Sequence, residues 1–271
     1  MENIQTRKLR EERRLSRLFM VDTEGKSAAR IASGAKIADD VRVDDRVIIG
    51  PDVKIESGCI IATEVEIRGR TTIGRNTRIS TGALLGFPPQ HREHEGKRTK
   101  LVIGSSCLIG ERATIHRGTS ERGITRLGRG VRLGALAHVA HDCLLGDGVR
   151  LDTLTQLAGL VEIGNNAHLG NMVGVHQHVR IGSGAVVFDH AKINKDVPPY
   201  LKAAGQPAEI TGTGNCPSTE ARLMITRAYE LLCRSGLNIK QARKKIKEEL
   251  SGPAITELLA FLEKSSRGIC R

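Results

Sequence analysis

Three histidines in two short segments are the residues best suited to move a proton. His138 and His141 lie in AHVAHDC, and His176 lies in GVHQHVRIG. A histidine titrates near neutral pH, so it can accept a proton from a hydroxyl or an amine. Asp142 follows His141 and could orient the ring, although neighbours on a flat strand point to opposite faces. General-base chemistry is therefore open to His141, with Asp142 as a supporting carboxylate, and His138, His176 and His116 are further candidates.

Covalent catalysis is not favoured by the rest of the sequence. Cys143 follows Asp142, but a free cysteine is most often a small buried apolar residue. No serine or second cysteine stands beside a base of its own. We predict that an acceptor attacks its target directly, without a covalent enzyme intermediate.

The elements that position these histidines follow a six-residue repeat. Every sixth residue is Ile, Leu or Val from Ile31 to Leu85, from Ile103 to Ile115, and from Leu127 to Ile193. This period fits a left-handed parallel β-helix with three short strands in each coil of about 18 residues. Glycine follows many of the aliphatic residues, and we expect these glycines at the corners. The register places His141 and His176 near one edge, about 10 Å apart along the axis.

The repeat also divides the chain. We predict the β-helix over residues 27–200, with an excursion at 87–100 and a shorter one at 119–126 that mark the working face. Residues 1–26 are expected to form a charged helix or tail. The Pro198–Pro199 pair is expected to end the stack. Residues 201–271 are expected to form a linker and a helical domain, with helices starting near Ser218 and covering 239–250 and 255–262.

Composition narrows the class of protein. Hydrophobic residues make up 39% and aromatic residues only 2%, which suits a thin, regularly stacked core. The net charge of +12 indicates an acidic partner: a nucleic acid, a membrane surface, a phosphorylated ligand or an acidic protein. No apolar run is long enough to span a membrane, and the first residues do not read as a signal peptide. Six scattered cysteines predict free thiols in the cytoplasm.

Several motifs resemble one family closely. IHRGT (115–119), AHVAHDC (137–143), LAG (157–159), VHQ (175–177), DVPPY (196–200) and SRGICR (266–271) occur in order. Together they resemble the UDP-N-acetylglucosamine acyltransferases of lipid A biosynthesis. The resemblance implies a homotrimer with its active sites between prisms. It also implies transfer of a 3-hydroxyacyl chain from acyl carrier protein to the 3-position of the sugar nucleotide. The thioester would be the donor, and no further cofactor, metal, nucleic acid or membrane segment is expected.

The resemblance also implies residue roles. His141 matches the general base, and Gly159 matches the residue whose backbone N–H stabilises the oxyanion. The positions that match substrate contacts are His138, His176, Gln177, Gln90 and His91. Phe188 and Asp189 match the region that measures the acyl chain.

Some positions depart from the family pattern, and they keep other functions open. His91 stands where the family has an Asp that contacts the sugar, and Leu160 stands where it has a His. The segment ITGTGNCPSTEAR (210–222) offers no Arg pair to match the one that holds the nucleotide. One alternative is the same chemistry on another amino-sugar nucleotide or with a shorter acyl donor. Another is a non-catalytic trimeric scaffold that binds a sugar nucleotide. A zinc site like that of β-helical carbonic anhydrases is disfavoured, because the H-x4-H spacing is absent.

Overall fold

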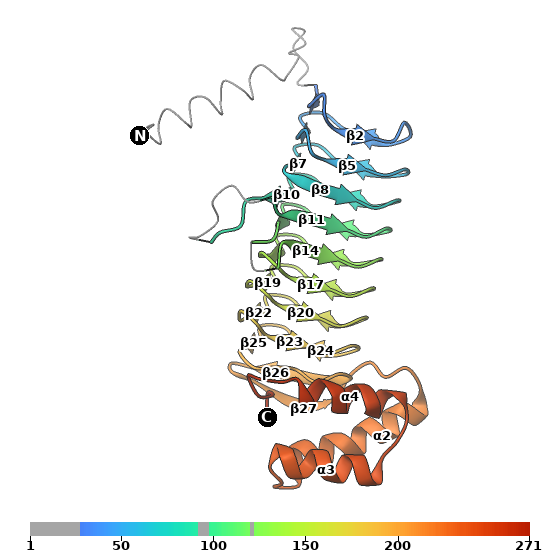
Figure 1. Ribbon diagram of the computed structural model, residues 1–271, viewed down its shortest axis with the longest axis vertical. Helices are drawn as coiled ribbons and strands as arrows, with labels where there is room; N and C mark the ends of the chain where they lie inside the picture. The colour runs from blue at the N-terminus through green and yellow to red at the C-terminus, as the bar shows by residue number, and fades with distance from the viewer. Residues whose placement is uncertain (1–27, 92–97, 120–121) are drawn as a thin grey trace.

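A computed structural model describes residues 28–91, 98–119 and 122–271 as a tall three-sided prism with helices at its C-terminal end (Figure 1). The expected segment at 1–26 and the middle of the 87–100 excursion lie outside the described residues. The prism is a left-handed parallel β-helix, so the predicted fold class is confirmed.

Up to β25 every third strand joins the same sheet, and the described strands form three sheets. The first sheet contains β1 (Arg30–Ile31), β4 (Ile48–Ile49), β7 (Glu66–Ile67), β10 (Leu84–Phe87), β13 (Thr114–His116), β16 (His138–Val139), β19 (Gln156–Leu157), β22 (Gly174–Val175) and β25 (Lys192–Ile193). The second contains β2 (Lys36–Ile37), β5 (Lys54–Ile55), β8 (Arg70–Ile73), β11 (Lys100–Ile103), β14 (Ile124–Leu127), β17 (Leu144–Leu145), β20 (Glu162–Ile163) and β23 (Arg180–Ile181). The third contains β3 (Arg42–Val43), β6 (Ile60–Ile61), β9 (Arg78–Ile79), β12 (Leu108–Ile109), β15 (Arg132–Leu133), β18 (Arg150–Leu151), β21 (His168–Leu169), β24 (Val186–Val187), β26 (Leu201–Gly205) and β27 (Ala208–Thr213).

The repeat aliphatics point into the prism and stack on one another. Ile49 pairs with Ile67 and is fully buried. At the two interruptions Ile79 pairs with Ile109, and Ile109 pairs with Leu133. The chain thus takes 30 and then 24 residues to return to the same position, yet the pairing register continues. The excursions lengthen a coil without shifting the inward face, which keeps the residues on either side of them in line.

The corners differ from the sequence expectation. A Cβ on Gly110 would lie 2.4 Å from the carbonyl carbon of Gly134, because successive coils approach closely there. The left-handed backbone that turns the corner comes two residues later, at Arg112 (φ 52°) and at Leu136 (φ 59°). Most glycines that directly follow a repeat aliphatic therefore serve inter-coil packing, with Gly86 (φ 73°) as an exception. The left-handed position is occupied by glycine in some coils and by other residue types in others.

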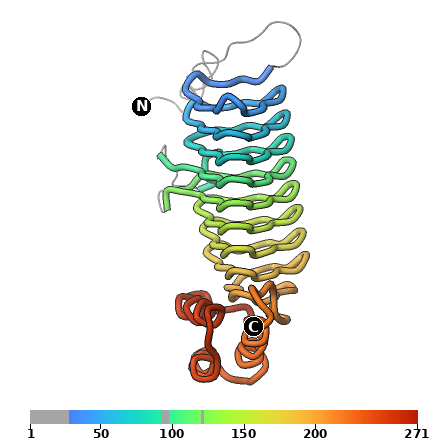
Figure 2. The backbone as a smooth tube through the Cα atoms, turned by 90° about the vertical axis from the view of Figure 1, so that its right-hand side faces the viewer, coloured from blue at the N-terminus to red at the C-terminus, as the bar shows by residue number. Residues whose placement is uncertain are grey.

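The C-terminal region extends the stack before it becomes helical (Figure 2). β26 continues the third sheet in parallel with β24, and β27 returns antiparallel to β26. The stack therefore continues past Pro198–Pro199, contrary to the expectation that these prolines end it. The helices are α2 (Thr219–Tyr229), η1 (Glu230–Arg234), α3 (Ile239–Glu249) and α4 (Pro253–Glu263). Ser218 caps α2 as expected. No helix in the described ranges is long and apolar enough to cross a membrane.

Candidate functional site

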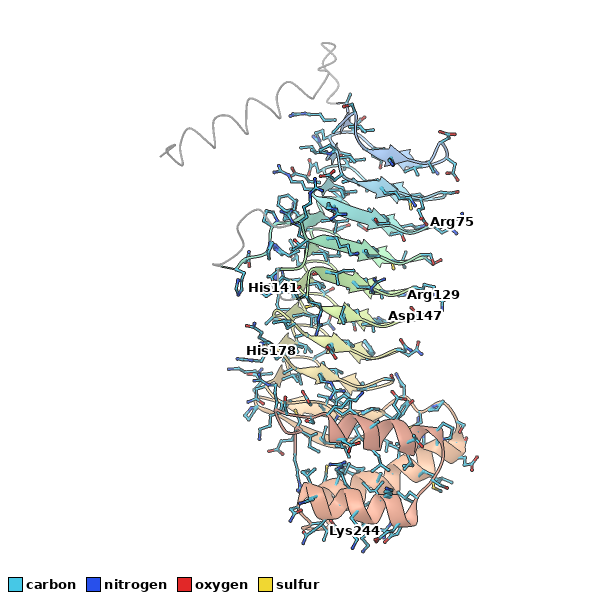
Figure 3. All side chains as sticks on the ribbon, viewed as in Figure 1. Arg75, Arg129, His141, Asp147, His178 and Lys244 are labelled. Atoms are coloured by element: carbon cyan, nitrogen blue, oxygen red, sulfur yellow. The ribbon has the colours of Figure 1, made fainter. Side chains whose placement is uncertain are left out.

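The predicted base lies at the corner that joins the first sheet to the second. His141 and Asp142 form the turn between β16 and β17. The carbonyl of His141 accepts from the N–H of Leu160 at 3.0 Å, and the carbonyl of Gly159 accepts from the N–H of His178 at 3.2 Å. These bonds stack His141, Gly159 and Gln177 in successive coils. Figure 3 shows His141 and His178 on the same edge of the prism.

His141 and Asp142 contact each other directly. Nδ1 of His141 lies 3.0 Å from Oδ2 of Asp142, whose side chain is fully buried. The flat-strand argument does not apply here, because Asp142 has a left-handed backbone (φ 59°) that turns its side chain toward His141. The carboxylate also accepts from the hydroxyl of Thr119 at 2.6 Å and from its N–H at 3.0 Å. With Nδ1–H donating to this fixed carboxylate, the lone pair on Nε2 is free to accept a proton.

Gly159 lies directly against the His141 ring. A Cβ at position 159 would lie 2.4 Å from Cε1 and 2.6 Å from Nε2 of His141, so this position accepts no side chain without moving the ring. The buried N–H of Gly159 makes no hydrogen bond among the described residues. At the equivalent turn position, the N–H of Asn171 donates to Asp189 of the next coil at 2.8 Å. Gly159 has Gln177 below it instead, which leaves an uncapped donor beside the base.

Three further histidines surround His141. The ring of His91 lies edge-on to that of His141, with centroids 5.3 Å apart. His116 and His138 make a second edge-on pair, also 5.3 Å between centroids. Nδ1 of His138 lies 2.6 Å from the hydroxyl oxygen of Thr114, and Nδ1–H of His116 donates to the Pro88 carbonyl at 2.6 Å. Burial lowers the pKa of both His116 and His138, which favours the neutral form of both rings.

The other residues predicted to contact the substrate lie around this corner and are exposed or half-buried. His176 is exposed, and Nη2 of Arg267 lies 3.3 Å from its Nδ1. Gln177 is half-buried below Gly159, and Gln90 is exposed at the start of the excursion. The sequence register thus brings most of the predicted residues to one edge.

Phe188 and Asp189 are the exception. They follow β24, at the corner that joins the third sheet to the first, whereas His141 lies at the corner between the first and second sheets. Phe188 is 47% exposed, and the carboxylate of Asp189 caps the N–H of Asn171. A single chain therefore does not bring these two residues to the base.

Sequence reasoning assigned no role to the residues that hold Asp142 in place. Thr119 belongs to the IHRGT motif, but it lies 23 residues before Asp142 and at the edge of an interruption. Arg122 donates to the Asp142 carbonyl at 2.9 Å and to Glu162 at 2.6 Å. For Thr119, the IHRGT motif was the sequence feature that could have indicated a role. The contact of Arg122 depends on the path of the second excursion.

Two other chemistries find little support at this corner. Burial raises the pKa of the Cys143 thiol to about 12, and its Sγ lies 3.2 Å from the Ala158 carbonyl oxygen. This thiol stays protonated, so it is a poor nucleophile. Within the described ranges, no group of three His, Cys, Asp or Glu side chains is arranged to hold a metal ion.

Comparisons with known proteins identify a family for this chain. Residues 196–270 match the family model described as Udp N-acetylglucosamine O-acyltransferase, Domain 2, and residues 34–69 match the bacterial transferase hexapeptide repeat. Proteins named acyl-[acyl-carrier-protein]--UDP-N-acetylglucosamine O-acyltransferase are similar in sequence. That of Syntrophobacter fumaroxidans is 38% identical over 90% of this chain and 98% of its own. That of Psychromonas ingrahamii is 47% identical over 69% of this chain and 74% of its own. The structure of LpxA from Acinetobacter baumannii superposes with a TM-score of 0.86 at 36% identity, covering 90% of this chain and 98% of that one.

Proposed function

The chain belongs to the family of acyl-[acyl-carrier-protein]–UDP-N-acetylglucosamine O-acyltransferases, and we propose that the corner formed by His141, Asp142 and Gly159 carries out the transfer. The enzyme moves an acyl chain from acyl carrier protein to the 3-position of UDP-N-acetylglucosamine, the first step of lipid A biosynthesis. One observation carries the assignment of residues. The backbone of Gly159, whose N–H makes no hydrogen bond among the described residues, packs against the His141 ring, and Asp142 is fixed on the Nδ1 side of that ring.

His141 acts as the general base. Its Nε2 takes the proton from the sugar 3-hydroxyl as that oxygen attacks the thioester carbonyl carbon. The imidazolium that forms is stabilised by the buried carboxylate of Asp142, which also holds the ring in the Nδ1–H form.

The N–H of Gly159 stabilises the intermediate. The carbonyl oxygen becomes an oxyanion as the new C–O bond forms, and a preorganised backbone donor binds it more strongly than it binds the carbonyl. When the oxyanion collapses, the C–S bond breaks, and the departing thiolate takes the proton from His141. The products are the sugar ester and the free thiol of acyl carrier protein, so no further cofactor is needed.

The neighbouring side chains select the acceptor. We assign substrate contacts to His91, His138, Gln177, His176 and Gln90, in line with their position along this edge. The edge-on contact of His91 with His141 places a ring, rather than a carboxylate, beside the sugar. This contact is the observation that keeps a different sugar nucleotide as the second candidate acceptor.

We propose that the enzyme is a homotrimer in which one chain completes the site of the next. Leu136, Leu154 and Met172 form an exposed apolar column on the edge between the third and first sheets. Each has a left-handed backbone, which costs a bulky residue about 1 kcal/mol. Phe188 and Asp189 continue this edge. Packing it against the His141 corner of a neighbouring chain would cover the apolar column and bring Phe188 to the acyl chain.

Substitution within the apolar column tests the trimer. Leu154→Glu places a charge in the proposed interface and should reduce the mass measured by light scattering from three chains to one. Met172→Leu keeps the column apolar and should remain trimeric. A wild-type monomer, or a Leu154→Glu trimer, would contradict this arrangement.

The helical region offers a docking surface for acyl carrier protein. One face of α3 is basic and borders a cavity of about 750 Å³ against α4. Charge complementarity with the acidic carrier protein would speed encounter. The basic residues that line it are Lys240, Arg243, Lys244 and Lys247. We place the reaction in the cytoplasm, in keeping with six free cysteine thiols.

Product analysis tests the proposed reaction. Purified enzyme is supplied with UDP-N-acetylglucosamine or its 3-amino analogue and with carrier proteins bearing 3-hydroxyacyl chains of graded length. We expect a base-labile 3-O-ester from the first acceptor. His141→Ala should abolish it, and His178→Asn, on the same edge, should not. Turnover with the amino sugar alone would move the function to the second candidate. Sugar-nucleotide binding without turnover of any pair would identify a non-catalytic scaffold.

A further inference from the structure

A second cavity lies on the same edge as His141, closer to the N-terminus. Its volume is about 390 Å³, within the range of small-molecule sites. It lies where the first sheet passes to the second, beside the starts of β8 and β11. The residues that line it are Asp52, Gly69, Arg70, Arg98, Thr99 and Arg117. None of them belongs to the acyl-transfer corner.

Positive charge converges on this cavity. Three arginines line it against the single carboxylate of Asp52. Among the described residues, none of the three arginines forms an ion pair. Burial lowers the pKa of Arg117, and no carboxylate offsets the effect. Arg117 is half-buried while Arg70 and Arg98 are exposed, and an anion bound between the three guanidinium groups would reduce their mutual repulsion.

The position of Arg117 is fixed by the backbone beneath it. Its Nη1 donates to the Gly86 carbonyl at 3.0 Å. Gly69 has a left-handed backbone (φ 58°), and a Cβ there would lie 2.7 Å from the same Nη1. The guanidinium therefore packs against bare backbone at the cavity wall, which leaves its other N–H groups available to a ligand.

Thr99 provides an independent indication of a ligand. Its side chain is only 4% exposed, and its hydroxyl makes no hydrogen bond in the described structure. A buried hydroxyl without a partner costs free energy, and nearly all such groups in proteins are satisfied. Thr99 is one of the residues that line the cavity that the arginines share. A phosphoryl oxygen would accept from Thr99 and from the guanidinium groups at once.

We propose that this cavity is a binding site for a phosphoryl group, held by Arg70, Arg98 and Arg117 together with the Thr99 hydroxyl. The shared chemistry is that of inorganic phosphate and of small phosphate monoesters. The site is separate from acyl transfer, and its occupancy can be measured without turnover.

Ligand binding to the full-length protein tests the proposal. Sodium phosphate and glycerol 3-phosphate are titrated by calorimetry at constant ionic strength, with chloride as the balancing salt. Thr99→Val removes the hydroxyl and keeps the shape. Arg98→Gln removes one charge, and Arg75→Gln removes a charge from a different edge, as seen in Figure 3. We expect saturable binding, weakened about tenfold by Thr99→Val and by Arg98→Gln and unchanged by Arg75→Gln.

The thermal stability of Thr99→Val gives a second readout. Without phosphate, the variant should be at least as stable as the wild type, because the replaced hydroxyl has no partner. With phosphate, the wild type should gain more in Tm than the variant. Binding of the monoester alone would identify an organic phosphate as the ligand, whereas binding of both would show that the phosphoryl group suffices. Binding of neither, or equal binding by all four proteins, would overturn the proposal.

Discussion

Replacing Gly159 with alanine separates catalysis from stability. The added Cβ would lie 2.4 Å from Cε1 of His141, where an ordinary contact begins near 3.4 Å. The backbone of Gly159 is outside the left-handed region, so alanine itself is tolerated there. The obstruction is therefore the imidazole ring, which must move by about 1 Å. That movement would lengthen the 3.0 Å bond from Nδ1 to Asp142 and displace Nε2 from the acceptor.

The size of the effect follows from this displacement. A misplacement of about 1 Å costs about 10²-fold in rate, which corresponds to about 2.7 kcal/mol of activation free energy. The free energy of unfolding should fall by only about 1 kcal/mol, because a side chain rather than backbone gives way. Gly159→Ala should thus be a folded protein with a kcat about 10²-fold lower.

Gly174→Ala is the matched control for this experiment. Gly174 lies in β22 of the same first sheet, and a Cβ there would meet nothing within 4 Å. We expect wild-type kcat and an unchanged or slightly higher Tm. Steady-state assays and thermal melts of both variants would be compared. A Gly159→Ala enzyme with kcat within about threefold of the wild type would refute the reasoning, because the ring position would then not matter.

Three further predictions concern the surroundings of the base. Asp142→Asn should lower kcat about 10³-fold with little change in KM, because the amide no longer holds His141 in the Nδ1–H form. A loss of kcat that only matches a loss of folded protein would argue against this. Burial lowers the pKa of His116 and His138 in the folded protein, so these two histidines bind protons more readily in the unfolded chain. The free energy of unfolding should therefore decline as pH falls below about 6.5. Urea titrations should show a smaller decline for His116→Asn, and an unchanged decline would contradict the assignment. Cys143→Ala should keep kcat within about threefold, and native Cys143 should resist alkylation at about pH 8, since burial raises its pKa to about 12; rapid labelling would contradict the burial.

The repeat made the fold predictable to the level of register. One inward aliphatic side chain per six residues is a strong periodic signal, and each excursion adds whole repeats, as the Ile79–Ile109 and Ile109–Leu133 pairs show. The edge that carries His141 followed from the same register. The role of each glycine could be predicted only in part, because a close approach between coils and a left-handed turn both favour glycine.

The interactions that complete the site were beyond the sequence pattern. The His141–Asp142 bond depends on the left-handed backbone of Asp142, whereas strand alternation would separate these neighbours. Thr119 contacts Asp142 from the edge of an interruption. The six-residue repeat is broken there, so it does not predict which residues become neighbours. The contact of His91 with His141 depends on the path of the first excursion. In each case the irregular backbone, not the repeat, determines the contact.

The pH dependence of kcat/KM for wild type and His141→Ala tests the central claim most directly. With UDP-N-acetylglucosamine and a 3-hydroxyacyl carrier protein, the wild-type rate should fall on the acid side, where a general base is lost. His141→Ala should be slower by about 10²-fold or more, and its acid limb should be lost. A variant that retains both the rate and the acid limb would show that another group is the base.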